Sequence, residues 1–204
     1  MNETQQEDTS TWQRMTKEEI NEYPIRKYEG SVHVIRTEEE LACALSLLKN
    51  EKILGFDTET RPAYVKGVSY PPTVLQLATA TEAFVFQLNH LGFPQPLIDI
   101  LANPDIVKTG VAINFDISEL VKLAHFKAEG FLDLADWAKE IGIQNHGLRG
   151  LAAVLLGFRI SKNAQTSNWA KDVLTPAQVI YAATDAWVGR ELYLKMQEIS
   201  AVKE

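Results

Sequence analysis

Two carboxylates stand close together at the end of an apolar segment of the sequence. In the run ILGFDTET, Asp57 and Glu59 are two residues apart and follow Ile53, Leu54 and Phe56. Side chains two apart on a strand lie on the same face. Two carboxylates held on one face repel each other unless a cation lies between them. The pair therefore predicts a metal ion, which requires further ligands from elsewhere in the chain.

Further groups that suit the same site lie in two later segments. Tyr181 and Asp185 are spaced i and i+4 in a helical pattern, so both project from one helix face. Asp116 follows the apolar run IVKTGVA at the start of another helical pattern. Asp116 and Asp185 also have ordinary alternatives, as a helix cap and as a solvated helix residue. Asp57 and Glu59 fit ordinary packing less well, because carboxylates are depleted in strands.

Strand and helix patterns predict how these residues are positioned. Apolar runs rich in β-branched and aromatic residues predict strands over 31–35, 53–57, 73–79, 83–88 and 106–112. The short connections between the second, third and fourth runs predict antiparallel neighbours. Helical periodicity predicts helices over 37–50, 96–103, 115–126, 133–142, 147–157 and 175–197. This order predicts an α/β fold with a mixed sheet flanked by helices.

The bulk composition predicts one domain preceded by an arm. A chain of 204 residues with 46% hydrophobic residues is long enough for one well-buried core. Residues 1–30 lack hydrophobic periodicity and are expected to form a disordered arm. Thr16 and Glu19 have the spacing of a capping box, which predicts one helical turn in this arm. Residues 31–200 are expected to form the single domain.

Charge and cysteine content narrow the class of protein. Cys43 is the single cysteine, and no apolar run approaches the roughly 20 residues that span a bilayer. The polar N-terminus resembles neither a signal peptide nor a basic targeting peptide. We therefore expect an intracellular protein without a membrane segment. The net charge of −7 argues against broad attraction to phosphate backbones, but bound cations can screen a nucleic-acid substrate from an acidic site.

The ordered set of acidic residues resembles a known family. The metal-dependent 3′-5′ exonucleases of the DEDDy group, in the ribonuclease H-like superfamily, carry a DxE pair, a second aspartate, and a tyrosine four residues before a third aspartate. Asp57 and Glu59 match the first motif, Asp116 the second, and Tyr181 and Asp185 the third. The run SNWAKDVLTPAQVIYAATDAWVGRELY resembles Werner-type exonucleases and, less closely, ribonuclease D.

The resemblance implies a ribonuclease H-like fold and a two-metal-ion mechanism. Two divalent cations, Mg²⁺ or Mn²⁺, stabilise the charge that gathers in phosphodiester hydrolysis, and both prefer oxygen ligands. Asp57 would bridge both ions, Glu59 and Asp185 would complete the first site, and Asp116 would hold the second. Tyr181 would orient the attacking water, since a tyrosine pKa near 10 makes a poor general base at neutral pH.

Four residues are weaker candidates for substrate contact. Lys162, Asn168 and Trp169 precede the last helix and could contact a strand by phosphate pairing and stacking. The alternative for Trp169 is that it anchors this loop to the core. Thr60 stands where many relatives carry a bulky aromatic residue, so substrate packing there differs.

The expected partner is a nucleic acid with a free 3′ end, with DNA favoured and RNA possible. The expected activity is release of nucleoside 5′-monophosphates by a 3′-5′ exonuclease, with a role in DNA repair. Alternatives are a catalytically silent nucleic-acid-binding module, a ribonuclease D-like RNA exonuclease and an endonuclease of the same superfamily. A helicase or another repair partner would have to be a separate chain.

Overall fold

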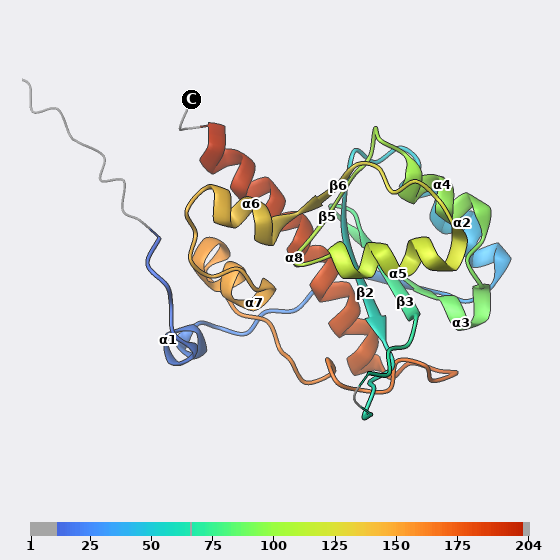
Figure 1. Cartoon of the computed structure of the whole chain (residues 1–204), viewed down its shortest axis with the longest axis horizontal. Helices are drawn as coiled ribbons and strands as arrows, with labels where there is room; N and C mark the ends of the chain where they lie inside the picture. Colours follow the sequence, from blue (N-terminus) through green and yellow to red (C-terminus); the bar gives the residue numbers. More distant parts are fainter. Residues whose placement is uncertain (1–11, 66, 202–204) are drawn as a thin grey trace, which may run out of the picture.

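A six-stranded sheet lies at the centre of the computed structural model, which describes residues 12–65 and 67–201 (Figure 1). The strands are β1 (Ser31–Ile35), β2 (Ile53–Thr60), β3 (Pro72–Ala78), β4 (Glu82–Gln87), β5 (Val107–Gly110) and β6 (Phe131–Asp133). Their order across the sheet is β1-β4-β3-β2-β5-β6.

The sheet is mixed, with an antiparallel centre and parallel flanks. The pairs β2–β3 and β3–β4 are antiparallel, as their short connections predict. The pairs β1–β4, β2–β5 and β5–β6 are parallel, and helices connect β1 to β2, β4 to β5 and β5 to β6 along the chain. The predicted α/β fold class is confirmed. Strand β6 is not predicted by the sequence patterns, because it has only three residues and runs directly into a helix.

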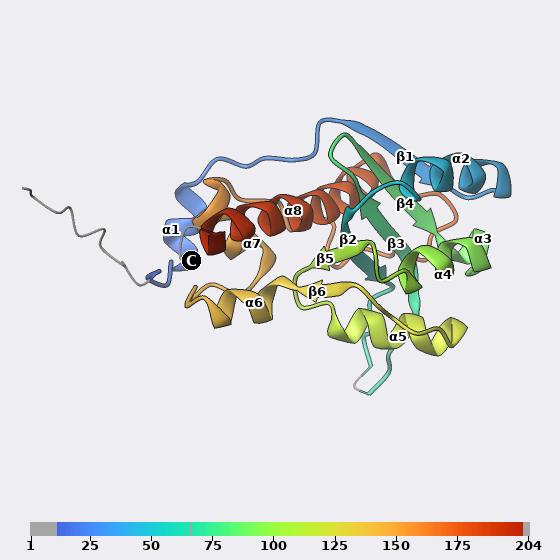
Figure 2. The same ribbon diagram turned by 90° about the horizontal axis from the view of Figure 1, so that it is seen from above.

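Helices cover both faces of this sheet. The helices of the described residues are α1 (Lys17–Glu22), α2 (Glu38–Leu48), α3 (Leu88–Leu91), α4 (Gln95–Ala102), α5 (Asn114–Ala124), α6 (Leu134–Glu140), α7 (Leu148–Leu151), the π-helical turn η1 (Ala152–Leu156) and α8 (Pro176–Ala201). Figure 2 shows α8 along one face and α5 on the opposite one. Alternate strand residues such as Phe56, Leu75 and Phe86 pack against α2, α4 and α5 in one continuous core.

Small residues bring α8 unusually close to the sheet. A Cβ atom added to Gly55 of β2 would lie 1.8 Å from the carbonyl oxygen of Ala186. Ala182, Ala183 and Ala186 of α8 are fully buried on this side of the sheet. The helix backbone therefore rests directly on β2, and the side chains that follow Gly55 on the same strand face lie beside α8.

The N-terminal segment corrects one sequence expectation. Residues 1–11 lie outside the described residues, but residues 12–30 are not an unstructured arm. The predicted helical turn forms as α1, with the complete capping box of Thr16 and Glu19. Beyond it, the backbone NH of Tyr28 donates to the Thr184 hydroxyl at 3.0 Å, and Ile25 pairs with Arg159 in a β-bridge. The segment is thus packed along the domain.

Helix boundaries follow their sequence signals with one exception. The last helix begins at Pro176, where Thr175 and Gln178 exchange hydrogen bonds as a capping box requires. The single helix predicted over 147–157 is instead α7 followed by the π-helical turn η1, which stops at Gly157. In the described part of the chain, no helix is both long and apolar enough to cross a membrane.

Candidate active site

The first two carboxylates lie on the face of β2 that meets α8. Asp57 pairs with Gln76 and Glu59 with Val74 of β3, and the register shifts between Glu59 and Thr60 where the strand ends. Oδ1 of Asp57 accepts a hydrogen bond from the Thr58 NH at 2.8 Å. The two acids therefore stand on one strand face, as their spacing predicts.

The third carboxylate is tied to β2 by a residue that the sequence patterns do not single out. Asp116 lies in the first turn of α5, and its Oδ1 accepts a hydrogen bond from the Thr58 hydroxyl at 2.5 Å. Thr58 stands between Asp57 and Glu59, so this bond fixes α5 against the end of β2. Burial raises the pKa of Asp116, and the Thr58 hydroxyl opposes that rise.

The remaining pair comes from α8, where Tyr181 and Asp185 are both buried. Burial raises the pKa of Asp185 to about 7, opposed by hydrogen bonding with the Tyr181 hydroxyl and by the charge of Lys162. Among the described residues, Oδ1 of Asp185 is a buried acceptor without a hydrogen-bond partner. An ionised carboxylate in that position needs a cation or a donor.

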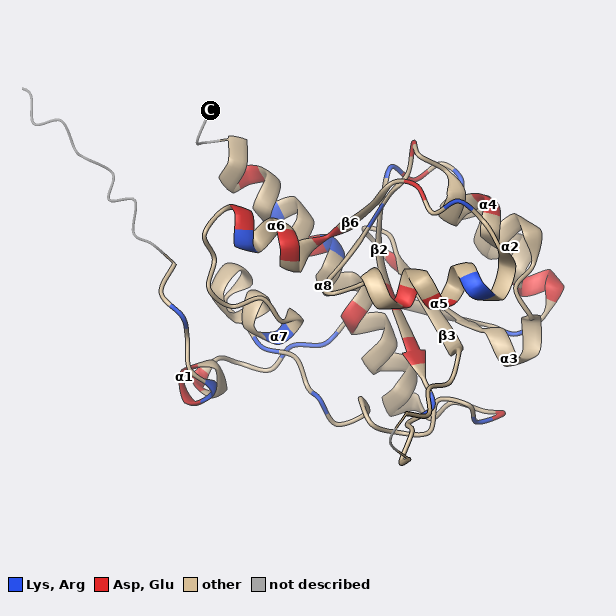
Figure 3. Cartoon of the chain, viewed as in Figure 1, with Lys and Arg blue, Asp and Glu red and all other residues tan. Residues whose placement is uncertain are grey.

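The charges of Asp57, Glu59, Asp116 and Asp185 act on one another. Burial and then the charges of Asp57, Asp185 and Asp116 raise the pKa of Glu59 to about 10. Burial also raises the pKa of Asp57, which is enclosed by protein although part of its surface opens to a cleft, and Asp185 and Asp116 raise it further. Figure 3 shows the acidic residues of β2, α5 and α8 converging where these elements meet.

The donor set fits hard divalent cations. Four carboxylates that repel one another, with an unpartnered oxygen on Asp185, favour a cation between them. Within the described residues, however, no three His, Cys, Asp or Glu side chains already converge as a metal-binding cluster. The chemistry of the residues therefore fits the cations, and their binding requires the carboxylates to draw closer together.

Three of the four carboxylates open into a cleft of about 990 Å³, and Asp116 is not among the residues described as lining it. Asp57, Glu59, Tyr181 and Asp185 line one part of it, together with Lys162. The other lining residues include His146 and Arg149 of the 144–150 segment and residues of the N-terminal segment. Thr60 and Asn168 are not among the residues described as lining the cleft.

For Trp169 the structure supports the second of the two sequence interpretations, an anchor of its loop to the core. Its side chain is 0% exposed and packs with Val74, Val85 and Tyr181, whose ring centroid lies 5.9 Å away. It therefore supports Tyr181 from the core and offers no surface for stacking on a substrate. Asn168 accepts a hydrogen bond from the NH of Ala170 within its own loop.

The sequence signature of a family described as 3′-5′ exonuclease matches residues 32–200. The chain belongs to the 3′-5′ exonuclease family. The mouse bifunctional 3′-5′ exonuclease/ATP-dependent helicase WRN is 34% identical over 155 residues, which are 73% of this chain and 11% of that protein. DNA polymerase I of Aquifex aeolicus is 31% identical over 162 residues, 79% of this chain and 26% of the polymerase. The chain thus spans a minor part of these relatives' length.

Solved structures of the family share this fold. The exonuclease domain of Aedes aegypti Nibbler has a TM-score of 0.77 and 22% identity, covering 89% of this chain and 94% of that one. Escherichia coli RNase D, an exoribonuclease, has a TM-score of 0.71 and 21% identity, covering 83% and 46% of the two chains. The mixed sheet is therefore the ribonuclease H-like sheet of these exonucleases.

Proposed function

We propose that this exonuclease-family domain is an active, divalent-metal-dependent enzyme that removes nucleoside 5′-monophosphates from 3′ ends. The observation that supports this most strongly is the assembly of four carboxylates with Tyr181 at one site. A module that only bound nucleic acid would have no use for clustered carboxylates, and burial followed by mutual repulsion raises the pKa of Asp57 and Glu59. Repelling acids in a cleft are characteristic of catalytic sites.

The residues divide into metal ligands and a water-orienting group. Asp57, Glu59, Asp116 and Asp185 would hold two divalent cations, Mg²⁺ or Mn²⁺. When bound, such cations neutralise charge on the phosphate and acidify water. Burial and the nearby carboxylates raise the pKa of Tyr181, so its hydroxyl stays protonated at neutral pH. Tyr181 therefore donates a hydrogen bond that orients the attacking water and does not act as a general base.

DNA is the proposed substrate, and RNA is the second candidate. The relatives that are at least 30% identical include a mouse exonuclease joined to an ATP-dependent helicase and a DNA polymerase, which favours DNA. The similarity of the fold to RNase D of Trypanosoma brucei, solved with RNA, keeps RNA as the alternative. A role in DNA repair follows from the first choice and is proposed with it. A contact to the 2′-hydroxyl would decide between the two substrates.

The test is digestion of single-stranded DNA and RNA that carry a 5′ label. The proposal predicts a ladder that shortens from the 3′ end, requires Mn²⁺ or Mg²⁺ and disappears with EDTA. Internal cuts without a ladder, or digestion that persists in EDTA, would contradict it. Faster shortening of RNA than of DNA would favour RNA as the substrate.

Two isosteric variants connect this activity to the site. Asp57→Asn and Asp185→Asn remove metal-ligand charge without changing side-chain volume, so we expect at least about a hundredfold loss of activity with the fold intact. Circular dichroism checks the fold, and Asp136→Asn, an exposed acid outside the site that pairs with Lys139, is the matched control. Full activity in either site variant would reject the assignment.

A further inference from the structure

The short helix α1 presents different charges on its two sides. Lys17, Ile20 and Asn21 have the spacing i, i+3 and i+4, and all three line the cleft together with Arg14 just before the helix. The acidic residues of the same helix are not among the described lining residues; they are Glu18, Glu19 and Glu22. Although the helix is acidic overall, the side that it turns to the cleft is cationic and polar.

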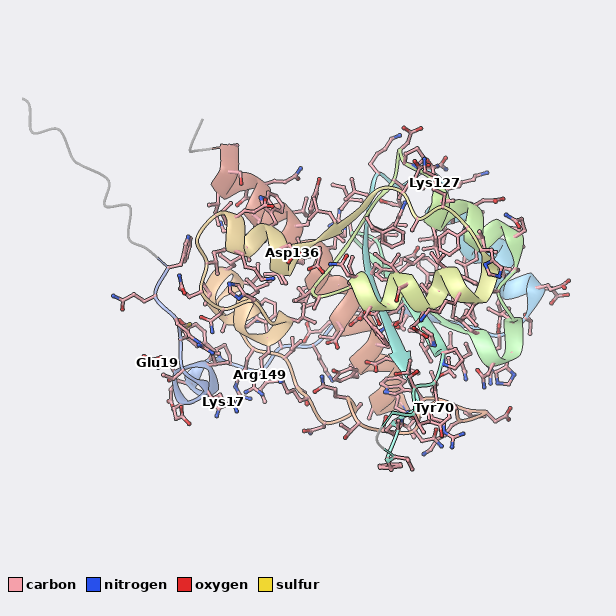
Figure 4. All side chains as sticks on the ribbon, in the orientation of Figure 1. Lys17, Glu19, Tyr70, Lys127, Asp136 and Arg149 are labelled. Carbon is pink, nitrogen blue, oxygen red and sulfur yellow. The ribbon has the colours of Figure 1, made fainter. Side chains whose placement is uncertain are left out.

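This segment is held in place on the rim of the cleft. The Asn145 side chain accepts a hydrogen bond from the Met15 NH at 2.9 Å and donates one to the Met15 carbonyl at 3.0 Å. The guanidinium of Arg149 donates to Oδ1 of Asn21 at 2.5 Å. Figure 4 shows Lys17 and Arg149 beside each other where α1 meets α7. The orientation of α1 is therefore fixed by the 144–150 segment.

The cations of the cleft are not neutralised by the protein. Across the described residues, the ion pairs include none made by Arg14, Lys17, Arg149 or Lys162. Elsewhere lysines with an acid nearby do pair, as Lys122 does with Glu119. Four basic side chains without ion pairs around one cleft attract an anionic ligand. Near the carboxylates, such a ligand can bind only when metal cations screen the negative charge.

A single nucleic-acid strand satisfies both parts of the cleft. Its 3′-terminal phosphodiester would lie at the carboxylates, and its preceding phosphates would follow the cleft toward α1. The cleft volume of about 990 Å³ is at the upper end of the range for small-molecule sites, which suits a strand of more than one nucleotide. Lysine and arginine contacts to phosphates position a strand without selecting its sequence.

We infer that Arg14 and Lys17, with Arg149, form a phosphate-binding wall for the strand upstream of the nucleotide being removed. This inference rests on the proposed function for the direction of the strand. The family signature covers residues 32–200, so Arg14 and Lys17 lie outside it. The wall would act on binding, because the phosphates it contacts are not the one that reacts.

The experiment compares two double variants with the same change in net charge. Arg14→Ala/Lys17→Ala removes the wall, and Lys52→Ala/Lys127→Ala removes two exposed lysines outside the cleft. Figure 4 shows Lys127 far from Lys17 and Arg149. Binding of a fluorescent single-stranded oligonucleotide is measured by anisotropy over a range of salt concentrations. Cleavage is measured on the oligonucleotide and on a dinucleotide, which has no internucleotide phosphate upstream of the bond that is cut.

For Arg14→Ala/Lys17→Ala we expect about tenfold weaker binding of the oligonucleotide and about tenfold higher KM with kcat unchanged. The slope of log affinity against log salt falls in magnitude by about 1.4, which is about 0.7 for each of two lost phosphate contacts. Cleavage of the dinucleotide and the behaviour of Lys52→Ala/Lys127→Ala stay at the wild-type level.

Three results would contradict the proposed phosphate-binding wall. They are unchanged oligonucleotide binding in Arg14→Ala/Lys17→Ala, an equal loss in Lys52→Ala/Lys127→Ala, and an equal loss of cleavage on the dinucleotide. Because anisotropy needs no turnover, the wall is tested even if the wild-type protein cuts nothing. A wild-type protein that binds but never cuts would contradict the proposed function and leave the binding result to decide on the wall.

Discussion

The buried carboxylates of this site destabilise the folded state when they are ionised and no cation is bound. Glu59 has an ordinary pKa of 4.5, which burial and three neighbouring acids raise to about 10. A carboxyl group whose pKa is raised on folding stabilises the folded state below pH 4.5, and this contribution is lost as the pH rises toward 10. Thr58 partly offsets the repulsion at the other end of the site by holding Asp116.

The first prediction at this scale concerns Glu59→Gln. In EDTA, the free energy of unfolding of the wild-type protein should fall between about pH 5 and about pH 9, and the fall should be smaller in Glu59→Gln. At the upper pH the variant should therefore be the more stable of the two, with its Tm higher by roughly 2–4 °C for each 1 kcal/mol of relieved repulsion. Urea unfolding at several pH values measures this.

Mn²⁺ supplies the control for that prediction. Added Mn²⁺ should stabilise the wild-type protein more than Glu59→Gln, because a ligand that binds the folded state more tightly raises the free energy of unfolding by a larger amount. If the free energy of unfolding depends on pH in the same way in both proteins in EDTA, ionised Glu59 does not destabilise the folded state.

Among the elements, β2 and α8 carry the site between them. Gly55 lets the α8 backbone approach β2, and the strand then presents Asp57 and Glu59 beside the helix face that carries Tyr181 and Asp185. The sequence predicts both elements, because the strand alternation and the Thr175 and Pro176 start signals are strong. It does not predict their contact distance, which depends on a glycine meeting a backbone carbonyl across a gap of more than a hundred residues.

The second prediction concerns this contact. Gly55→Ala would place a methyl group 1.8 Å from the Ala186 carbonyl oxygen, so α8 must move away from β2. We expect a loss of about 1–3 kcal/mol in the free energy of unfolding and a fall in activity from separated carboxylates. Gly147→Ala, where an added Cβ meets nothing within 4 Å, is the stability control. Wild-type stability in Gly55→Ala would show that the close contact does not constrain the helix.

In the whole molecule, the sequence predicted features that depend on local patterns better than features that depend on packing between distant segments. The mixed sheet and most of the helices followed from periodicity, caps and connection lengths. The site candidates Asp57, Glu59, Asp116, Tyr181 and Asp185 followed from residue spacing together with the resemblance to the DEDDy exonucleases. The structure brings these five together. What the sequence missed depends on contacts between distant segments, which leave no local pattern.

The misses share that physical cause. The N-terminal segment looked unstructured because it has no periodicity, yet Ile20 and Tyr28 are buried against the domain. Trp169 looked available to a substrate because it lies in a polar loop, yet it packs beneath Tyr181. Strand β6 has three residues, too few to show alternation, and forms because β5 offers it a parallel edge.

The central claim is that Asp57, Glu59, Asp116 and Asp185 close around divalent cations at a single phosphodiesterase centre. The measurement that tests it most directly is anomalous X-ray diffraction from crystals grown with Mn²⁺ and a nucleoside 5′-monophosphate. We predict two anomalous peaks among these four carboxylates, both in contact with Asp57, and none there in crystals of Asp57→Asn. Mn²⁺ bound elsewhere, or no peak between the carboxylates in the wild-type protein, would contradict the account.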